Sequence, residues 1–356
     1  MSGDHSTSGA GSEEVRPQSR RKRKRLNDGI VDVDKYENGG GKMSKDVDNT
    51  SVEYVKDDLI ELDEEKTGER GEDVVIDLIE DVLVEGKDIG PDGPVADGEV
   101  ASEDSRVLFE FPPSKKGSIK LTTADRDRLA PEKYLNDSII DFYIKFIEMF
   151  ETPPRLRDQC YFFNSFFFNL LFTSPKVIHH KNVKRWTQEV DLFTKKYIFV
   201  PICRNSHWTL IVICNCGKLP GWERDHDNPE DRPVMLIYDS LRTSSVASSY
   251  AVALKAYLAE EYQSKFAGKP DFTAPDFSKM TAWIPRVPSQ SNEFDCGLYI
   301  LQYIIAFLQD TPEELQEKKD VNRPDWFTVA DIEMLREHIR VVMIGQEEYL
   351  TSKKPA

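Results

Sequence analysis

The sequence lacks long apolar runs and paired cysteines. None of its 356 residues belongs to an apolar run of 18, and no apolar signal region stands at the start. The five cysteines are odd in number and irregularly spaced, and the Cys214–Cys216 pair has no second Cys or His pair at zinc spacing. We therefore expect a soluble protein of a reducing compartment, with no membrane association, disulfide, metal or cofactor.

Aromatic residues are almost missing from residues 1–105. Only Tyr36 and Tyr54 of the chain's 37 Phe, Trp and Tyr lie there. The same segment holds 14 Lys and Arg against 29 Asp and Glu, a net charge of −15 out of −16 for the whole chain. So acidic a segment buries too little apolar surface to offset its ordering entropy. We expect a disordered acidic tail over 1–105 and one folded domain over 106–350.

Six consecutive basic residues interrupt the acidic tail. They are Arg20, Arg21, Lys22, Arg23, Lys24 and Arg25. A compact, isolated cluster of this kind is typical of a nuclear import signal that importin binds through single side chains. The alternatives are a solvated charge run or a nucleic-acid contact. We favour import, expect a nuclear location, and expect no direct binding of nucleic acid.

A short aliphatic segment stands further along the tail. Its apolar residues are Val74, Val75, Ile76 and Leu78, and acidic residues flank them. Such a segment can add as a strand to the edge of a partner's sheet. It resembles the SUMO-interacting motif, and residues 59–65 form a weaker second copy. The alternative is a chance aliphatic run.

The remainder alternates between helical and strand patterns. Apolar residues at helical spacing predict helices over 123–129, 136–148, 164–171, 249–266 and 331–343. Short β-branched or aromatic runs predict strands over 106–111, 119–123, 197–201, 207–216, 234–239 and 283–288. A polar stretch over 217–233 predicts a hairpin loop or flexible excursion. Together these patterns predict an α+β fold with a central mixed sheet flanked by helices.

Cys296 and Gly297 directly precede a strongly apolar helical stretch over 298–308. A thiol at a helix N-terminus lies beside unpaired backbone N–H groups and the positive end of the helix dipole. Both favour the thiolate, which is the nucleophilic form. The alternative for a lone cysteine is a small core residue.

A cysteine hydrolase also needs a base, a group that orients it, and donors for the oxyanion. Of the six histidines, His207 alone begins a strong strand, and Asp239 ends the neighbouring one. Antiparallel strands joined in sequence bring these two ends together. Gln290, six residues before Cys296, can donate its amide to the oxyanion. Each residue alone is more often structural; the combination is much more specific.

These motifs together resemble the SUMO-specific cysteine proteases of the Ulp/SENP family over about residues 106–345. The matching segments are 134–137, 163–167, 183–186, 207–208, 238–240 and 288–297. The resemblance implies a papain-like cysteine protease fold and a catalytic set of His207, Asp239, Cys296 and Gln290. It also implies cleavage after the Gly-Gly end of SUMO, to release the modifier from lysine.

The resemblance further implies a narrow substrate tunnel beneath Trp208 and Tyr134, with Asp137 binding a basic residue of the modifier. Core packing for Trp208 and a helix cap for Asp137 are the alternatives. Many members have Trp where this chain has Tyr134. The 217–233 insert resembles the branch of the family that trims SUMO chains more than the branch that matures precursors. We also expect a monomeric enzyme whose partners are SUMO and SUMO-conjugated proteins. A protease for another ubiquitin-like modifier and an inactive SUMO-binding adaptor remain alternatives.

Overall fold

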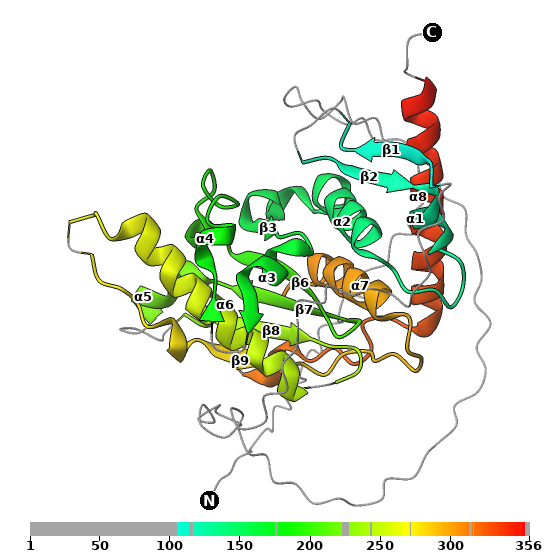
Figure 1. Ribbon diagram of the computed structural model, residues 1–356. Helices are drawn as coiled ribbons and strands as arrows, with labels where there is room; N and C mark the ends of the chain where they lie inside the picture. The colour runs from blue at the N-terminus through cyan, green and yellow to red at the C-terminus, as the bar shows by residue number, and fades with distance from the viewer. Residues whose placement is uncertain are drawn as a thin grey trace, which may run out of the picture.

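The computed structural model describes residues 105–352 apart from 114–116, 175–176, 223–227, 243, 271, 313–314 and 316. The tail predictions on residues 20–25, 59–65 and 74–78 lie outside the described residues. Helices cover both faces of a central five-stranded sheet (Figure 1). The α+β class, with a mixed sheet flanked by helices, is therefore confirmed.

The central sheet has the strand order β3-β6-β7-β8-β9. Its strands are β3 (Cys160–Phe162), β6 (Tyr197–Arg204), β7 (His207–Cys214), β8 (Val234–Tyr238) and β9 (Thr281–Trp283). Strand β7 is antiparallel to both of its neighbours, β6 and β8, whereas the two outer strands pair in parallel with theirs. The middle of the sheet is thus the pair of consecutive hairpins that the sequence order predicts.

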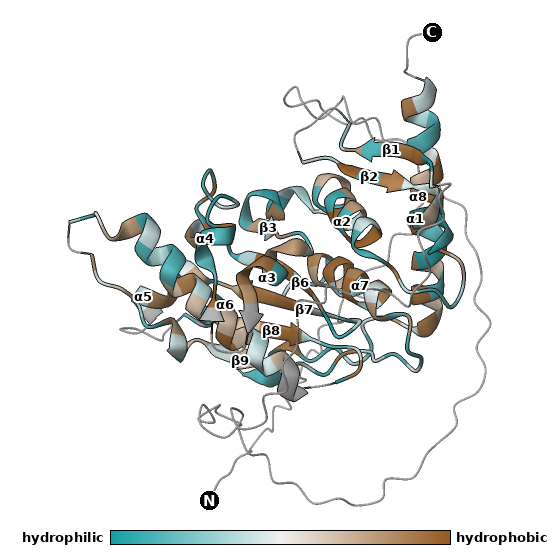
Figure 2. Cartoon of the chain, in the orientation of Figure 1, coloured by the Kyte–Doolittle hydropathy of each residue, from teal (hydrophilic) through white to brown (hydrophobic). Residues whose placement is uncertain are grey.

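Side chains of the central strands alternate between two hydrophobic cores, as a period of two requires. One core joins the sheet to α2 (Asp137–Phe146), α7 (Cys296–Gln309) and α8 (Val329–Ser352). The other joins it to α3 (Phe166–Leu171) and α6 (Ser244–Phe266). Hydrophobic residues are concentrated in the central strands (Figure 2), which explains why both faces of the sheet are covered.

A separate hairpin packs beside α2 and α8. It consists of β1 (Val107–Phe111) and β2 (Ile119–Thr122), followed by α1 (Thr123–Asp127). Phe109 and Phe111 meet the ring of Phe142 edge-on, with centroids 5.8 and 5.1 Å apart. Such aromatic pairs fix the hairpin to the main core.

The smaller elements lie mostly in the connections. They are η3 (Ile147–Glu151), η4 (Pro154–Gln159), β4 (Phe172–Ser174), β5 (Val177–Ile178), α4 (His180–Val183), η5 (Leu192–Thr194), η6 (Cys216–Lys218), α5 (Leu219–Trp222), η7 (Pro229–Asp231), η8 (Phe277–Lys279) and η9 (Lys318–Val321). Within the described residues, no helix is long and apolar enough to cross a lipid bilayer.

Some predicted elements begin or end at other residues in the structure. The last strand covers 281–283 rather than 283–288, because Pro285 and Pro288 have no N–H to donate to a neighbouring strand. The 217–233 insert joins the antiparallel strands β7 and β8, as a hairpin loop should, and its described part contains short helical turns. The Asn215 amide closes it by donating to the carbonyls of Glu230 and Arg232. The last helix extends to Ser352, well beyond the predicted end at Met343.

Candidate active site

The helix α7 begins at Cys296, the position where the sequence predicts its start. The thiol is buried, with 1% of the residue exposed. Gly297 follows in close contact: a Cβ there would lie 3.1 Å from Leu135 Cβ and 3.4 Å from Trp208 Cδ1. Glycine therefore lets the N-terminus of α7 approach the wall that carries Trp208.

His207 opens β7 directly after a tight turn. Asn205 and Ser206 have φ of 51° and 58°, the two positive values that a type I′ hairpin turn needs. Because β7 pairs antiparallel with β8, the start of β7 lies beside Asp239, just beyond the end of β8. His207 Nε2 and Asp239 Oδ1 are 2.7 Å apart, and the aspartate side chain is 1% exposed.

The Cys296 side chain acts on the same imidazole, because it is among the groups that raise the pKa of His207. Because Nε2 faces Asp239, the other ring nitrogen, Nδ1, is the one left for the thiol. Burial lowers the pKa of His207, but the hydrogen bonds and charges of Asp239 and Cys296 outweigh it and raise the pKa to about 9. The imidazolium form of His207 is therefore favoured at neutral pH.

Gln290 is held against the residue that follows Asp239. Its backbone N–H donates to the Ser240 carbonyl at 3.1 Å, and Ser240 Oγ donates to Gln290 Oε1 at 2.6 Å. Its Nε2 donates to the Asn292 carbonyl at 2.6 Å. A primary amide carries two N–H bonds. The Gln290 side chain can therefore donate its second N–H to a substrate while the first still donates to Asn292.

Trp208 and Tyr134 lie on neighbouring segments. Trp208 is buried, and its Nε1 donates to the carbonyl of Leu135 at 3.3 Å. Tyr134, the residue before Leu135, is 37% exposed. The structure thus ties the segment carrying Tyr134 to the residue after His207.

Asp137 is the first residue of α2 and does not cap it. Asn136 is the cap, because its Oδ1 accepts from the Ile139 N–H at 3.3 Å. The cap alternative for Asp137 is therefore wrong. Burial raises the pKa of the Asp137 carboxyl, and no donor in the described part of the chain reaches its buried Oδ1.

Sequence reasoning missed two buried side-chain groups. His180 is buried in α4, with its Nε2 2.6 Å from Glu261 Oε2. Arg336, in α8, donates to Asp295 Oδ1 at 2.6 Å, directly beside Cys296. Both partners are remote in sequence, and no local pattern identifies such pairs.

Cys214 and Cys216 lie in the hydrophobic interior, as expected of structural cysteines. Both thiols are fully buried and lie against the carbonyls of Val212 and Leu192, at 4.0 and 3.8 Å. Burial raises the pKa of the Cys216 thiol to about 12, and it raises that of Cys214 as well. A thiol of this kind is unreactive near neutral pH.

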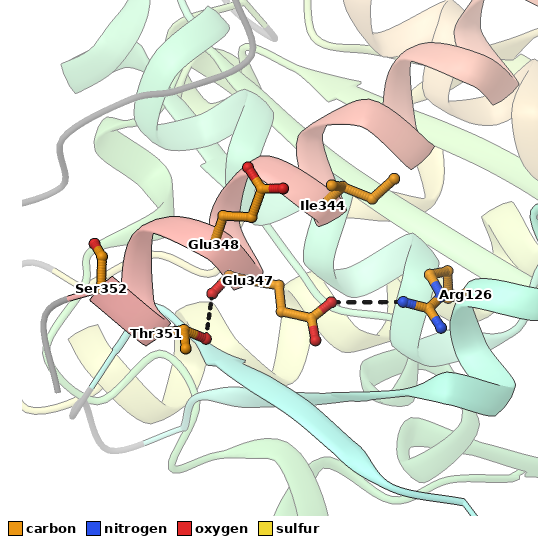
Figure 3. Close-up of a pocket in the computed structure, with 6 residues that line it drawn as sticks. All are labelled: Arg126, Ile344, Glu347, Glu348, Thr351 and Ser352. Atoms are coloured by element: carbon orange, nitrogen blue, oxygen red, sulfur yellow. Dashed lines mark hydrogen bonds and ion pairs between the residues drawn. The ribbon is translucent and has the colours of Figure 1, made fainter.

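A separate hollow at the end of α8 contains none of these residues (Figure 3). It has a volume of about 680 Å³ and is lined by Arg126, Ile344, Glu347, Glu348, Thr351 and Ser352. Arg126 forms an ion pair with Glu347 at 3.5 Å, which joins α1 to α8. Its lining includes no nucleophile paired with a base.

The sequence is similar to those of known proteins. Residues 133–340 match the Ulp1 protease family, C-terminal catalytic domain. A probable ubiquitin-like-specific protease 2B of Arabidopsis thaliana is 33% identical over 240 residues, which cover 64% of this chain and 26% of that protein. Sentrin-specific protease 7 of Mus musculus is 29% identical over 298 residues, covering 67% and 28% of the two chains.

The chain spans between about a quarter and a third of the length of these curated relatives. The crystal structure of a protein described as the de-sumoylating protease aligns over 70% of this chain and 96% of its own, at 24% identity and a TM-score of 0.54. That similarity shows a common fold. Since the family match covers more than half of the sequence, the chain belongs to the Ulp1 protease family.

Proposed function

We propose that the chain is a SUMO-specific cysteine isopeptidase that cleaves after the modifier's C-terminal Gly-Gly and releases it from lysine. One observation carries the proposal: His207 forms a hydrogen bond with Asp239, Cys296 helps to raise the pKa of the same imidazole, and Cys296 begins a helix. A nucleophile, a base and a group that orients the base are the parts that acyl transfer to a thiol requires. The matched family supplies the class of substrate.

The proposed reaction has two steps. The Cys296 thiolate attacks the carbonyl carbon of the terminal glycine, and the oxyanion accepts N–H bonds from Gln290 and the Cys296 backbone. His207 then gives its proton to the departing lysine amine, which leaves a thioester on Cys296. Water attacks the thioester, His207 takes the water's proton, and the thiol is released with the SUMO carboxylate.

The burial of Cys296 supports a requirement for glycine. The thiol is 1% exposed and lies near Trp208, which packs against Gly297. A substrate chain without Cβ atoms is the slenderest that can reach such a thiol. Tyr134 forms the outer part of the proposed tunnel, and the carboxylate of Asp137 accepts from a basic residue of the modifier.

We further propose that the tail directs the enzyme. The cluster Arg20–Arg25 binds importin, which gives a nuclear location, and the segment 74–78 tethers a monomeric enzyme to SUMO chains. The insert over residues 217–233 supports assignment to the chain-trimming branch. Replacing Val75, Ile76 and Leu78 with Ala should then slow the cleavage of SUMO chains more than that of a single SUMO. Equal slowing of both would contradict the tethering role.

The proposal is tested with SUMO, ubiquitin and Nedd-type modifiers, each bearing a C-terminal electrophile. We expect a covalent adduct with the SUMO probe alone, detected by intact mass, and no adduct on Cys296→Ala. An adduct with a different modifier would assign the protease to that modifier. Binding of SUMO without any adduct would instead support the adaptor alternative.

A further inference from the structure

Arg336 reaches from the last helix to the turn that presents the nucleophile. It lies in α8 and is 8% exposed. Its Nη2 donates to Asp295 Oδ1 at 2.6 Å, and Asp295 is the residue before Cys296. Its Nη1 donates to the carbonyls of Arg128 and Ala130 at 3.2 and 3.1 Å. One guanidinium therefore joins three segments that are far apart in the sequence.

The carboxylate of Asp295 continues the connection within the nucleophile turn, residues 290–296. Asn292 Nδ2 donates to Asp295 Oδ2 at 2.7 Å, and Asn292 Oδ1 accepts from the Asp295 N–H at 3.1 Å. Both Asp295 oxygens thus have a fixed donor. Asp295 makes no side-chain cap bond to α7, so its carboxylate serves the turn rather than the helix.

The same turn holds the proposed oxyanion donor. Gln290 Nε2 donates to the carbonyl of Asn292, and Ser240 Oγ donates to Gln290 Oε1, both at 2.6 Å. Ser240 follows Asp239, the partner of His207. Hydrogen bonds therefore run from Arg336 through Asp295, Asn292 and Gln290 to the strand end that orients the base.

The second contact of Arg336 is made to the opposite wall. Arg128 and Ala130 lie in the turn that leads to Leu135, whose carbonyl accepts from Trp208. A planar guanidinium can hold a carboxylate and two carbonyls at fixed angles, which the single ammonium of lysine cannot do. The wall beside Trp208 and the nucleophile turn are thus joined through one side chain.

We infer that Arg336 is a positioning residue of the protease: it fixes the nucleophile turn, with Cys296 and Gln290, against the wall that carries Trp208. The inference rests on the proposed function and deepens it. Arg336 touches no reacting atom and acts through Asp295. An error of about 1 Å in the placement of reacting groups can lower a rate by roughly 100-fold.

The test compares Arg336→Gln with Arg336→Lys and the wild type. We expect Arg336→Gln to lower kcat for a SUMO–lysine isopeptide by about 10- to 100-fold per folded molecule. Arg336→Lys should recover part of this loss through its charge. Adding Asp295→Asn to Arg336→Gln should cost little more, because both changes break one connection.

Arg126→Gln is the matched control. It removes the ion pair with Glu347, another polar contact between α8 and the N-terminal segments, and it leaves the nucleophile turn untouched (Figure 3). Urea unfolding gives the folded fraction of each variant. If Arg336 only attaches α8 to the domain, Arg126→Gln will lower kcat to a similar extent, and the inference is overturned.

Alkylation of Cys296 by chloroacetamide separates this inference from the proposed function, because it needs no modifier. We expect about tenfold slower alkylation at pH 7 in Arg336→Gln and an unchanged rate in Arg126→Gln. An unchanged alkylation rate and kcat in Arg336→Gln would overturn the inference while the isopeptidase proposal stands. If the wild type cleaves no SUMO conjugate, the proposed function fails, and the alkylation rates alone decide the role of Arg336.

Discussion

The described part of the domain contains two pairs of histidine and carboxylate, one at the adjacent ends of β7 and β8 and one between α4 and α6. In one, His207 Nε2 lies 2.7 Å from Asp239 Oδ1; in the other, His180 Nε2 lies 2.6 Å from Glu261 Oε2. The two histidine side chains are 16% and 8% exposed. By geometry alone the pairs are almost the same.

They differ in what surrounds the pair. Glu261 also accepts from Thr187 Oγ1 at 2.6 Å and lies 3.6 Å from Lys265 Nζ, and the Lys265 ammonium donates to the carbonyls of Thr187 and Val190. His180 Nδ1 lies 3.9 Å from Glu260. This pair ties α4 and the loop after it to α6. His207, in contrast, has a thiol at its second nitrogen.

A buried histidine and carboxylate therefore do not by themselves indicate a catalytic site. The third group decides: a thiol at a helix N-terminus gives nucleophilic chemistry, whereas a threonine and a lysine give a cross-link between structural elements. The following predictions test this distinction.

The largest effect should come from His207→Gln. Without the base, cleavage of a SUMO–lysine isopeptide should fall by about 10⁴-fold or more, as in other enzymes that lose a member of a catalytic triad. Stability should also fall at neutral pH, because the raised pKa of His207 means that its charged form stabilises the folded state and Gln carries no charge. Single-turnover cleavage and urea unfolding measure the two quantities. A loss of less than tenfold would remove His207 from the proposed mechanism.

Asp239→Asn should have the second largest effect, about 10²- to 10⁴-fold on kcat. The raised pKa of His207, about 9, means that the imidazolium persists above the ordinary value of 6.5. The folded state then binds more protons between pH 6.5 and 9, so stability from this group is full below 6.5 and is lost as pH rises through 9. Wild-type cleavage should likewise decline above about pH 9.

The pH profile of kcat checks this prediction. In Asp239→Asn the declining limb should move to lower pH, because the charge and hydrogen bond that raise the pKa of His207 are lost. An unchanged limb would mean that a group other than His207 sets it.

His180→Gln should affect stability rather than chemistry. It weakens the partner of a buried carboxylate and should lower the free energy of unfolding by about 1–3 kcal/mol. Cleavage per folded molecule should stay within about threefold of the wild type. Urea unfolding and cleavage corrected for folded fraction check both points. A large loss of cleavage here would mean that the two pairs are not functionally distinct.

Ser206→Gly should have the smallest effect. Ser206 has a φ of 58° in the turn before His207, a value that glycine adopts without strain. We expect a gain of about 0.5–1 kcal/mol in unfolding free energy. The matched change Asn205→Gly should gain less, because asparagine tolerates this conformation better. Thermal unfolding of the two variants measures the difference.

Local patterns predicted the elements that present the proposed chemistry. The short, nearly continuous apolar runs of β6, β7 and β8 and the dense apolar run of α7 are signals within one segment. The proximity of His207 and Asp239 followed from the order of two antiparallel strands.

Features that depend on remote partners could not be predicted. Glu261 is 81 residues from His180, and Asp295 is 41 residues from Arg336. A polar residue with such a partner looks like any exposed polar residue until the fold brings the two together. The end of α8 was missed for a different reason: Gly345 weakens the helical pattern, and packing against β1 supports the helix beyond it.

The most direct test of the distinction between the two pairs is the reaction of a SUMO C-terminal electrophile with wild type, His207→Gln and His180→Gln, followed by peptide mapping. We predict an adduct on Cys296 that forms at similar rates in the wild type and His180→Gln. In His207→Gln the adduct should form far more slowly. Equal rates in the two histidine variants, or an adduct on a cysteine other than Cys296, would contradict the assignment of His207 and Cys296 as the reacting pair.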